Sequence, residues 1–313
     1  MQAAILERPG RFVLEERPLP EVGPHEIRVR TAVCGMCTSE LDMFEGVPSL
    51  EYPRFIGHEV SGVVDAVGSK VEGFEEGDRV ALYAEGQGYA EYVTVPAAWA
   101  VPLADATPFE YALGEPIACS VNGVRKAKPE LNDSVCIVGC GFMGLMMLQV
   151  FKARGAGHLI AVDTRESARR LALEVGASHA VGPDEAEGLV QDLTGGKGVD
   201  IGVEAAGIQA TLDLTTQLVR MEGKLEVFGF HQGARREVDW GYWNWMAFQI
   251  VNGHTRSPHV YVEGMRLGIG MIERGALDMA PLVTHRYALD EINRGFETAS
   301  AKEEGFVKGI IAF

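Results

Sequence analysis

Residues 134–163 constrain the fold of this chain more than any other segment. An apolar run at Val135–Val138 is followed by a helical pattern at Leu145–Arg154, and a second apolar run at Leu159–Val162 ends at Asp163. Three glycines at G-x-G-x-x-G spacing join the first run to the helix: Gly139, Gly141 and Gly144. This order of strand, tight turn, helix and strand predicts one βαβ unit, the building block of a parallel sheet.

The spacing of the glycines has a chemical reason. Gly139 permits the sharp turn, Gly141 lets a pyrophosphate approach the backbone, and Gly144 lets helix and strand pack closely. The free N–H groups and the dipole of the helix N-terminus favour an anion there. Asp163 lies 19 residues after Gly144, near the roughly 20 expected for an acid that binds the ribose. The segment predicts a dinucleotide site, and the alternative is a glycine-rich turn without a ligand.

The acid at the end of the second strand bears on the choice of cofactor. Asp163 favours NAD over NADP, because it accepts a hydrogen bond from a free ribose 2′-OH and repels a 2′-phosphate. NADP remains an alternative, because three arginines follow closely: Arg165, Arg169 and Arg170. These arginines also fit the solvated first turn of a helix. We predict that further residues of the glycine turn and of later strand ends also bind the cofactor: Phe142, Met143, Arg165, Ala205 and Phe228.

Composition and charge narrow the class of protein. The chain has 313 residues, of which 47% are hydrophobic and 23% charged, as expected for a globular protein of two domains. A net charge of −16 argues against partners such as nucleic acid or an anionic membrane surface. No apolar run is long enough for a membrane span and no signal peptide is evident, so we expect a cytoplasmic protein. Five cysteines do not form a disulfide framework in a chain of this length.

The remaining sequence predicts an α/β protein with an additional β-rich domain. Residues 1–100 contain short strand patterns, such as Ile27–Thr31, Val60–Val67 and Tyr92–Val95. From residue 117 onward, strand and helix patterns alternate, which predicts a doubly wound parallel sheet. The expected elements there include helices at Ser167–Gly176 and Leu212–Arg220, strands at Asp200–Glu204 and Lys224–Phe230, and a turn at Met221–Gly223.

The last part of the chain is predicted to return to the first domain. We expect helices at Val262–Arg274 and Leu289–Ser300 and a final strand at Phe306–Phe313. Just before this return, Trp240–Trp245 reads WGYWNW. This aromatic segment could line a substrate or subunit surface, and we favour hydrophobic packing at a domain or dimer seam.

Two short segments of the β-rich region contain residues that bind metals. The first, Val33–Gly46, reads VCGMCTSELDMFEG, and the second, Ile56–Gly62, reads IGHEVSG. Together they present Cys34, Cys37, Ser39, Glu40, Asp42, His58 and Glu59. Cysteine, histidine and carboxylate are donors typical of zinc, and three protein ligands with a replaceable water make a catalytic site.

The cysteines and the histidine are also compatible with roles outside a catalytic zinc site. Cys34 and Cys37 could be a redox pair, but no thioredoxin-like βαβ context surrounds them. They could be half of a four-cysteine zinc site, but a second pair is missing. Cys136 and Cys140 lie in the nucleotide-binding segment and are expected to be packing residues. His58 by itself would more often be a hydrogen-bonded core histidine than a ligand.

The sequence resembles the zinc-dependent medium-chain alcohol dehydrogenases of the polyol, sorbitol and threonine dehydrogenase type. The matching segments run almost from end to end: CGMCTSE at 34–40, GHEVSG at 57–62, GDRV at 77–80, GYAEYVTVP at 88–96, EP at 115–116, VGCGFMG at 138–144, VEAAG at 203–207, PLVTHRYALDEINRGFE at 281–297 and VKGIIAF at 307–313. The resemblance implies a GroES-like catalytic domain, residues 1–116, that is completed by residues 254–313. It also implies a Rossmann domain that binds NAD, residues 117–253.

The resemblance implies a ligand set for one catalytic zinc ion. Cys37 matches the thiolate ligand and His58 the imidazole ligand. Glu115, before Pro116, matches a third ligand position, and Glu59 matches a carboxylate that binds zinc in some relatives. Glu59 and Glu115 are therefore alternatives for the third place.

The resemblance also implies roles for residues near the ion. Ser39 matches the hydroxyl that takes the substrate proton, and Glu40 matches a carboxylate that orients His58. Lys308 matches a basic residue that contacts the cofactor pyrophosphate. Asp42 stands where many relatives end a proton relay with a histidine, so it is either part of a relay or an ordinary surface acid.

One segment of the family pattern is missing. Relatives with a structural zinc carry a lobe with four cysteines after GDRV, whereas residues 81–88 here run directly into AEYV. We therefore predict a single, catalytic zinc per chain and no structural zinc.

These observations favour an NAD-dependent zinc enzyme that oxidises a secondary alcohol, polyol or sugar alcohol, or reduces the matching ketone. The alternatives are a zinc-independent enone or quinone reductase of the same fold and a nucleotide-binding relative without activity, like the lens crystallins of this family. The resemblance also implies a homodimer or homotetramer.

Overall fold

The computed structural model describes residues 1–47, 49–233 and 235–313, and its backbone divides into two units. Unit 1 comprises Met1–Ala118, Arg256–Gly275 and Met279–Phe313, and unit 2 comprises Cys119–Thr255 with Ala276–Asp278. The predicted boundaries, after residues 116 and 253, lie two residues before these divisions. The short piece at 276–278, which joins unit 2, was not predicted.

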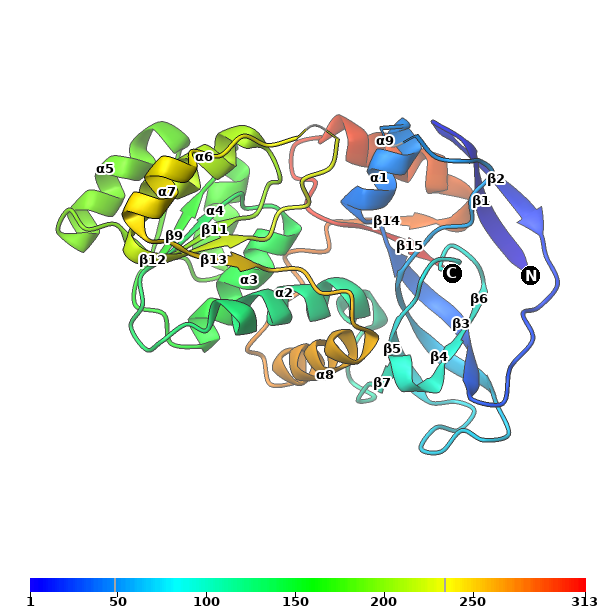
Figure 1. Cartoon of the computed structure of the whole chain (residues 1–313). Helices are drawn as coiled ribbons and strands as arrows, with labels where there is room; N and C mark the ends of the chain where they lie inside the picture. The colour runs from blue at the N-terminus through cyan, green and yellow to red at the C-terminus, as the bar shows by residue number, and fades with distance from the viewer. Residues whose placement is uncertain (48, 234) are drawn as a thin grey trace. The chain divides into compact units, whose positions relative to one another are not determined.

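Unit 1 is built on a curved sheet of mostly antiparallel strands (Figure 1). Along the sheet the strands follow the order β14-β15-β3-β4-β5-β7, and β6 also pairs with β3. These strands are β3 (Glu26–Gly35), β4 (Glu59–Val67), β5 (Arg79–Tyr83), β6 (Tyr92–Pro96), β7 (Ala100–Pro102), β14 (His285–Ala288) and β15 (Gly309–Ala312). Strands β1 (Gln2–Arg8) and β2 (Arg11–Glu16) form a separate antiparallel pair. The last strand thus completes the sheet of the first domain, as the sequence predicts.

Four α-helices and three short 3-10 helices accompany this sheet among the described residues. They are α1 (Thr38–Glu45), α2 (Gly114–Ala127), which continues into unit 2, α8 (Pro258–Glu273), α9 (Ile292–Ala301), η1 (Ala97–Trp99), η2 (Phe109–Tyr111) and η3 (Leu289–Glu291). A buried aromatic cluster holds α1 and α9 beside the sheet. Phe44 of α1 and Phe296 of α9 have ring centroids 5.3 Å apart, and Tyr89 packs edge-on against Phe296 at 5.8 Å. Helix α1 was not predicted from the sequence.

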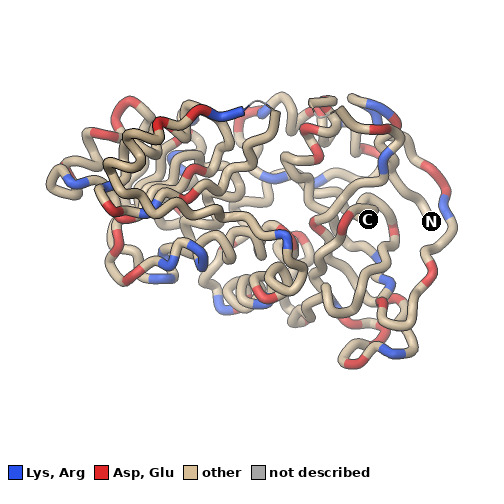
Figure 2. The backbone as a smooth tube through the Cα atoms, viewed as in Figure 1, with Lys and Arg blue, Asp and Glu red and all other residues tan. Residues whose placement is uncertain are grey.

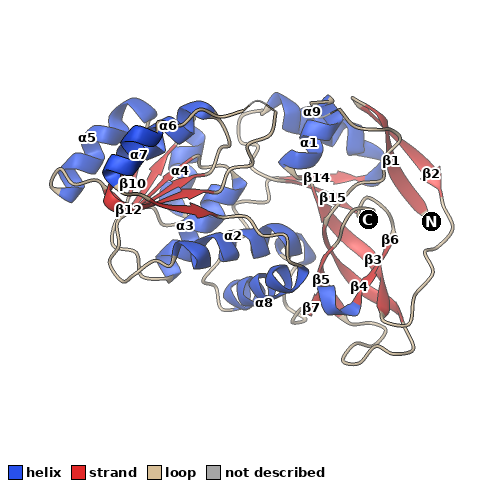
Figure 3. Ribbon diagram, viewed as in Figure 1, coloured by secondary structure: helices blue, strands red, loops and turns tan. Residues whose placement is uncertain are grey.

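Unit 2 is a parallel sheet with helices on both faces (Figure 3). Its strands are β8 (Val135–Val138), β9 (Leu159–Val162), β10 (His179–Val181), β11 (Val199–Glu204), β12 (Val219–Val227) and β13 (Gln249–Asn252). Their order is β10-β9-β8-β11-β12-β13, and each adjacent pair is parallel. This is the doubly wound arrangement that the alternation of strands and helices predicts.

The helices of unit 2 follow the strands in turn. They are α3 (Phe142–Ala153), α4 (Glu166–Glu174), α5 (Pro183–Thr194), α6 (Gln209–Leu218) and α7 (Trp240–Met246). Figure 3 shows α5, α6 and α7 on one face of the sheet and α3 on the other. Cys136 and Cys140 are 0% and 2% exposed, which agrees with the prediction that they are packing residues.

One predicted turn in unit 2 lies at an irregular part of a strand, and one predicted strand end was wrong. The expected turn at Met221–Gly223 lies inside β12, where the pairing with β11 is irregular and Glu222 has a φ of 59°. The strand also ends at Val227, before the predicted end at Phe230. The pairing with β11 passes from Val219 directly to Lys224, and β13 pairs only from Lys224 onward, so the residues between them interrupt the regular strand.

Figure 2 shows acidic and basic residues along both units. In the described part of the chain, no helix combines the length and the apolar character that a bilayer-spanning segment needs.

Candidate functional site

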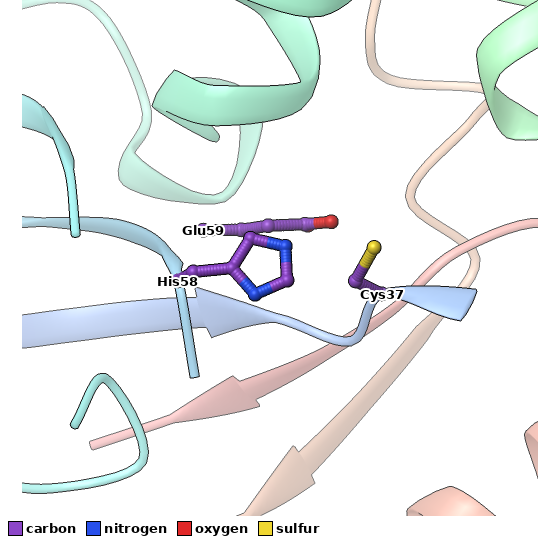
Figure 4. A group of neighbouring side chains, drawn as sticks. All are labelled: Cys37, His58 and Glu59. Atoms are coloured by element: carbon purple, nitrogen blue, oxygen red, sulfur yellow. The ribbon is translucent and has the colours of Figure 1, made fainter. Parts of the chain in front are cut away.

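Three side chains of unit 1 converge in the geometry of a metal site (Figure 4). One ligand atom from each of Cys37, His58 and Glu59 lies within 4.8 Å of the others. Cys37 is the residue before α1, and Glu59 is the first residue of β4. Because β3 pairs with β4 so that Gly35 faces Glu59, the chain after β3 reaches the start of β4. A thiolate, an imidazole and a carboxylate form a donor set that suits zinc.

The missing side chain at position 35 creates room for the glutamate. A Cβ built on Gly35 would lie 2.0 Å from Oε2 of Glu59. Any larger residue would therefore displace the carboxylate. Gly35 is a residue of the site that the sequence analysis did not single out.

Glu40 orients the histidine of this cluster. The side chain is 1% exposed, and its Oε1 lies 2.7 Å from Nδ1 of His58 and accepts the N–H of Gly57 at 2.8 Å. Its Oε2 accepts the hydroxyl of Tyr89 at 2.5 Å. Burial alone would raise the pKa of Glu40, but His58 and these hydrogen bonds lower it below its ordinary value. An ionised Glu40 holds the proton on Nδ1, which turns Nε2 of His58 toward a metal ion.

The charge of the histidine depends on the same neighbours. Burial lowers the pKa of His58, but the charges of Glu40 and Cys37 outweigh burial and raise this pKa well above its ordinary value. A metal ion binds the neutral imidazole, so binding at this site displaces a proton.

Lys308 has a partner that differs from the predicted one. Its Nζ lies 2.7 Å from Oε1 and 2.6 Å from Oε2 of Glu59 and donates to the carbonyl of Met36 at 2.8 Å. Burial lowers the pKa of Lys308, but Glu59 outweighs it and the pKa is raised. The ammonium therefore neutralises the carboxylate of the cluster. Contact between Lys308 and a pyrophosphate stays a prediction.

The two candidate proton-transfer residues occupy different surroundings. The Oγ of Ser39, which is half-buried, donates to Sγ of Cys37 at 3.3 Å, so this hydroxyl lies beside the cluster. Burial and Glu45 raise the pKa of Asp42, and Lys302 acts in the opposite direction. None of the charges that act on Asp42 belongs to the three clustered residues. Its role in a proton relay stays a prediction.

The structure brings one of the two candidates for the third ligand into the group of three. Within residues 1–47, 49–233 and 235–313, the group of three contains Glu59 and not Glu115. Glu115 lies in the first turn of α2, and both Glu115 and His58 act electrostatically on Tyr83. Glu115 therefore lies near the cluster, and the choice between Glu59 and Glu115 as the third ligand stays a prediction.

Tyr89 is a residue of the site that the sequence analysis missed. Its hydroxyl donates to Glu40 and also lies 3.0 Å from the carbonyl oxygen of Gly35. Burial and the charge of Glu40 raise the pKa of Tyr89 well above its ordinary value, so it remains a donor. The GYAEYVTVP segment at 88–96 contained this tyrosine, but only its family resemblance marked it.

The glycine turn of unit 2 has the backbone that the spacing predicts. Gly139 has a φ of 106°, and a Cβ on Gly144 would lie 2.1 Å from the carbonyl oxygen of Gly139. Gly141 precedes the first residue of α3, no side chain caps that helix, and a Cβ there would have no atom within 4 Å. Open space beside an uncapped helix N-terminus fits a pyrophosphate. These observations match a dinucleotide, whose individual contacts stay predictions.

Other residues predicted to bind the cofactor lie at the same edge of the sheet. Phe142 and Met143 open α3, and Ala205 follows β11 with its N–H donated to the carbonyl of Val138 at 2.9 Å. Ala205 also borders the turn, because a Cβ on Gly139 would lie 3.0 Å from its carbonyl carbon. Phe228 follows the end of β12 and is 5% exposed, so its ring packs inside the unit.

The carboxylate of Asp163, the residue after β9, accepts hydrogen bonds from its neighbours. Asp163 accepts the N–H of Cys140 at 2.9 Å and that of Arg165 at 2.9 Å. The guanidinium of Arg165 also lies 3.2 Å from this carboxylate. The carboxylate thus sits beside the glycine turn, as the ribose-binding role requires.

Comparison with known proteins agrees with the site. Residues 23–105 match the model of the alcohol dehydrogenase GroES-like domain, and residues 143–255 match that of the zinc-binding dehydrogenases. An L-threonine 3-dehydrogenase of Pyrococcus abyssi is 30% identical over 94% of this chain and 93% of its own length. An alcohol dehydrogenase of Cupriavidus necator is 27% identical over 98% of this chain and 97% of its own.

Solved structures show the same fold. A 2R,3R-butanediol dehydrogenase of Bacillus subtilis has a TM-score of 0.88 at 24% identity, covering 100% of this chain and 99% of its own. A zinc-binding dehydrogenase of Sinorhizobium meliloti, solved with NADP, has a TM-score of 0.87 at 25% identity, with coverage of 100% and 99%.

We predict that Glu40 controls metal affinity through His58. Glu40→Gln removes the charge that holds the proton on Nδ1, and zinc affinity should fall about 10- to 100-fold. Tyr89→Phe removes one hydrogen bond to Glu40 and should cause a smaller loss. Competition with a chromogenic chelator measures both affinities.

Tyr92→Phe is the control for these variants, since it removes a tyrosine hydroxyl from β6 without touching the Glu40 network. Its zinc affinity should equal that of the unmodified protein. Equal affinities for Glu40→Gln and the unmodified protein would contradict the assigned role of Glu40.

Proposed function

Because the chain belongs to the zinc-binding alcohol dehydrogenase family, we propose that it is a zinc-dependent oxidoreductase that transfers a hydride between an alcohol and NAD. The observation that carries the proposal is the cluster of Cys37, His58 and Glu59, with Glu40 behind the histidine. Three donors leave a coordination position open, which a catalytic site needs and a structural site does not.

Several protein residues would have separate roles in such a site. When bound, zinc supplies a Lewis acid that polarises the substrate oxygen and favours loss of its proton. Ser39, whose hydroxyl lies 3.3 Å from Sγ of Cys37, would accept this proton while passing its own proton on to solvent, through the cofactor ribose or Asp42. Lys308 compensates the charge of Glu59, and Glu40 fixes the tautomer of His58. A bound nicotinamide would supply the redox chemistry, and the residues of unit 2 would orient it.

The names of the relatives indicate the chemical class of the substrate. Their names include threonine and butanediol dehydrogenases, and threonine and 2,3-butanediol both carry a secondary hydroxyl group. We therefore propose a secondary alcohol, a polyol or a sugar alcohol, together with the matching ketone. A zinc-independent reductase or a nucleotide-binding relative without activity would have no use for the ordered donor set around His58.

We predict about one zinc ion per purified chain. Cys37→Ser should remove both zinc and alcohol-dependent NADH formation, because it replaces the thiolate ligand, while binding of NADH at unit 2 is retained. Elemental analysis, NADH titration and an activity screen with polyols and secondary alcohols test this.

We propose a cytoplasmic location, where reducing conditions keep the five free cysteines as thiols.

Cys34→Ala is the matched control, since Cys34 is a buried core residue of β3 outside the group of three. It should keep its zinc and its activity. Full activity in a zinc-free Cys37→Ser protein would exclude the proposed mechanism, and zinc-free unmodified protein would favour the zinc-independent reductase.

We predict that the protein binds NADH more tightly than NADPH. Asp163 would repel a 2′-phosphate, whereas Arg165, now paired with Asp163, would attract it if the acid were removed. Asp163→Ala should therefore shift the ratio of the two affinities toward NADPH by about tenfold or more, the size expected for loss of one nearby charge. Fluorescence titration with both cofactors measures the ratio. Tighter binding of NADPH to the unmodified protein would contradict the assignment.

We propose that the chain forms a homo-oligomer through the β13 edge of unit 2. Strand β13 ends the strand order, and Ile250 on it is 46% exposed. On α7, Trp243 is buried, whereas Trp240 and Trp245 are 58% and 76% exposed. An open edge strand beside exposed aromatic residues is a surface that a second copy can cover.

The oligomer predicts a mass in solution of at least twice the 33.9 kDa of one chain. The double variant Ile250→Lys, Trp245→Glu should sediment as a monomer, because it places charges on the covered surface. A monomeric unmodified protein in sedimentation velocity experiments would refute this assembly.

A further inference from the structure

Glu226 is a buried acid for which the described part of the chain offers no hydrogen-bond partner. It is the penultimate residue of β12 and is 0% exposed. Among the described residues, neither Oε1 nor Oε2 has a partner. Buried polar groups in native proteins nearly always have one, so an acid like this requires an explanation.

Two glycines border the carboxyl group. A Cβ on Gly123 of α2 would lie 3.1 Å from Oε1 of Glu226, and a Cβ on Gly253, just after β13, would lie 2.9 Å from it. A Cβ at either position would also lie close to the ring of Phe228, and the shortest of these distances is 2.6 Å, from Gly253. The acid and the ring therefore share the space that the two glycines leave, and substitution of either glycine would press on both.

The charged and titratable groups of the neighbouring elements leave the acid largely uncompensated. Lys126 of α2 acts on it, but its Nζ donates to the carbonyl of His254, whose ring stacks on Phe228 at 5.8 Å. On β12 itself, Nζ of Lys224 donates to a carbonyl at the end of α2, 2.7 Å away. On β11, Oε1 of Glu204 accepts hydrogen bonds from two N–H groups of the following turn and from the hydroxyl of Thr211 in α6.

Burial sets the protonation of this acid. It raises the pKa of Glu226 from 4.5 to about 8, and Lys126 offsets only part of this effect. At neutral pH the group is therefore mostly protonated, and a modest change in local potential would change its charge.

The position of Glu226 connects it to the nucleotide. Ligands of a doubly wound sheet bind outside the carboxyl ends of the strands. The glycine turn follows that end of β8, and Phe228 follows that end of β12, two strands along the sheet. The nicotinamide ring carries a positive charge when oxidised and none when reduced. An uncompensated acid at this edge is placed to respond to that difference.

Building on the proposed function, we propose that Glu226 releases its proton when the oxidised cofactor binds and keeps it when the reduced cofactor binds. The O–H bond of the carboxylic acid breaks, the electron pair stays on the carboxylate, and the proton goes to solvent. No electron is transferred in this step. The resulting carboxylate attracts the oxidised ring, so Glu226 adjusts the relative affinities for NAD⁺ and NADH.

Calorimetric titration in buffers of different ionisation enthalpy counts the protons directly. A unit charge about 10 Å away, at an effective dielectric constant of about 20, shifts a pKa by about one unit. At pH 7.5, Glu226→Gln should then release roughly half a proton less than the unmodified holoenzyme on binding NAD⁺. The two proteins should not differ on binding NADH. In the unmodified protein, the affinity for NAD⁺ relative to NADH should rise up to about tenfold between pH 6 and pH 9. This pH-dependent rise should be absent in Glu226→Gln.

Glu222→Gln is the matched control, since it makes the same change at an exposed position of β12. It should behave like the unmodified protein. Glu226→Met provides an apolar replacement of similar length should the buried amide prevent folding.

The outcomes separate the two proposals. Equal proton release on NAD⁺ binding by the unmodified protein, Glu226→Gln and Glu226→Met would overturn the role of Glu226 while leaving the enzyme assignment intact. Absence of any proton release by the unmodified protein would overturn it without a variant. Failure to bind either form of NAD or NADP would instead overturn the proposed function.

Discussion

The candidate active site depends on the buried carboxylate of Glu40. It is tied to the backbone of Gly57, to the ring of His58 and to the hydroxyl of Tyr89. These partners join α1, the start of β4 and the chain before β6, which are separate parts of unit 1. Each bond stabilises the ionised form, and together they offset the cost of burying the charge. Without Glu40, His58 would have neither a fixed tautomer nor a fixed orientation.

A second carboxylate of the site has two possible partners. Glu59 belongs to the candidate metal-binding group and also forms a buried ion pair with Lys308. Both interactions need the same ionised oxygens, so a bound cation and the ammonium share one carboxylate. The ion pair also favours the close approach of the three side chains, because the positive charge of Lys308 offsets the negative charge of Glu59.

The sequence predicted the parts of the structure that local patterns determine. The glycine turn at Gly139–Gly144 follows from residues that are neighbours in the chain, and its conformation is as expected. Cys37 and His58 could be paired because their segments resemble a known family. The contact from Tyr89 to Glu40 spans 49 residues and that from Lys308 to Glu59 spans 249. No periodicity or spacing carries such information, since it arises only when distant strands pair.

Glu40 and Glu226 show why the sequence alone does not determine the charge of an acid. Both are almost fully buried, at 1% and 0% exposure. Glu40 has donors on both oxygens, which lower its pKa, whereas Glu226 has none among the described residues, and its pKa is raised. Partners rather than burial thus decide the sign of the shift. A carboxylate that is always charged suits the permanent task of orienting a ligand, and an acid near its titration point suits a response to a charge that comes and goes.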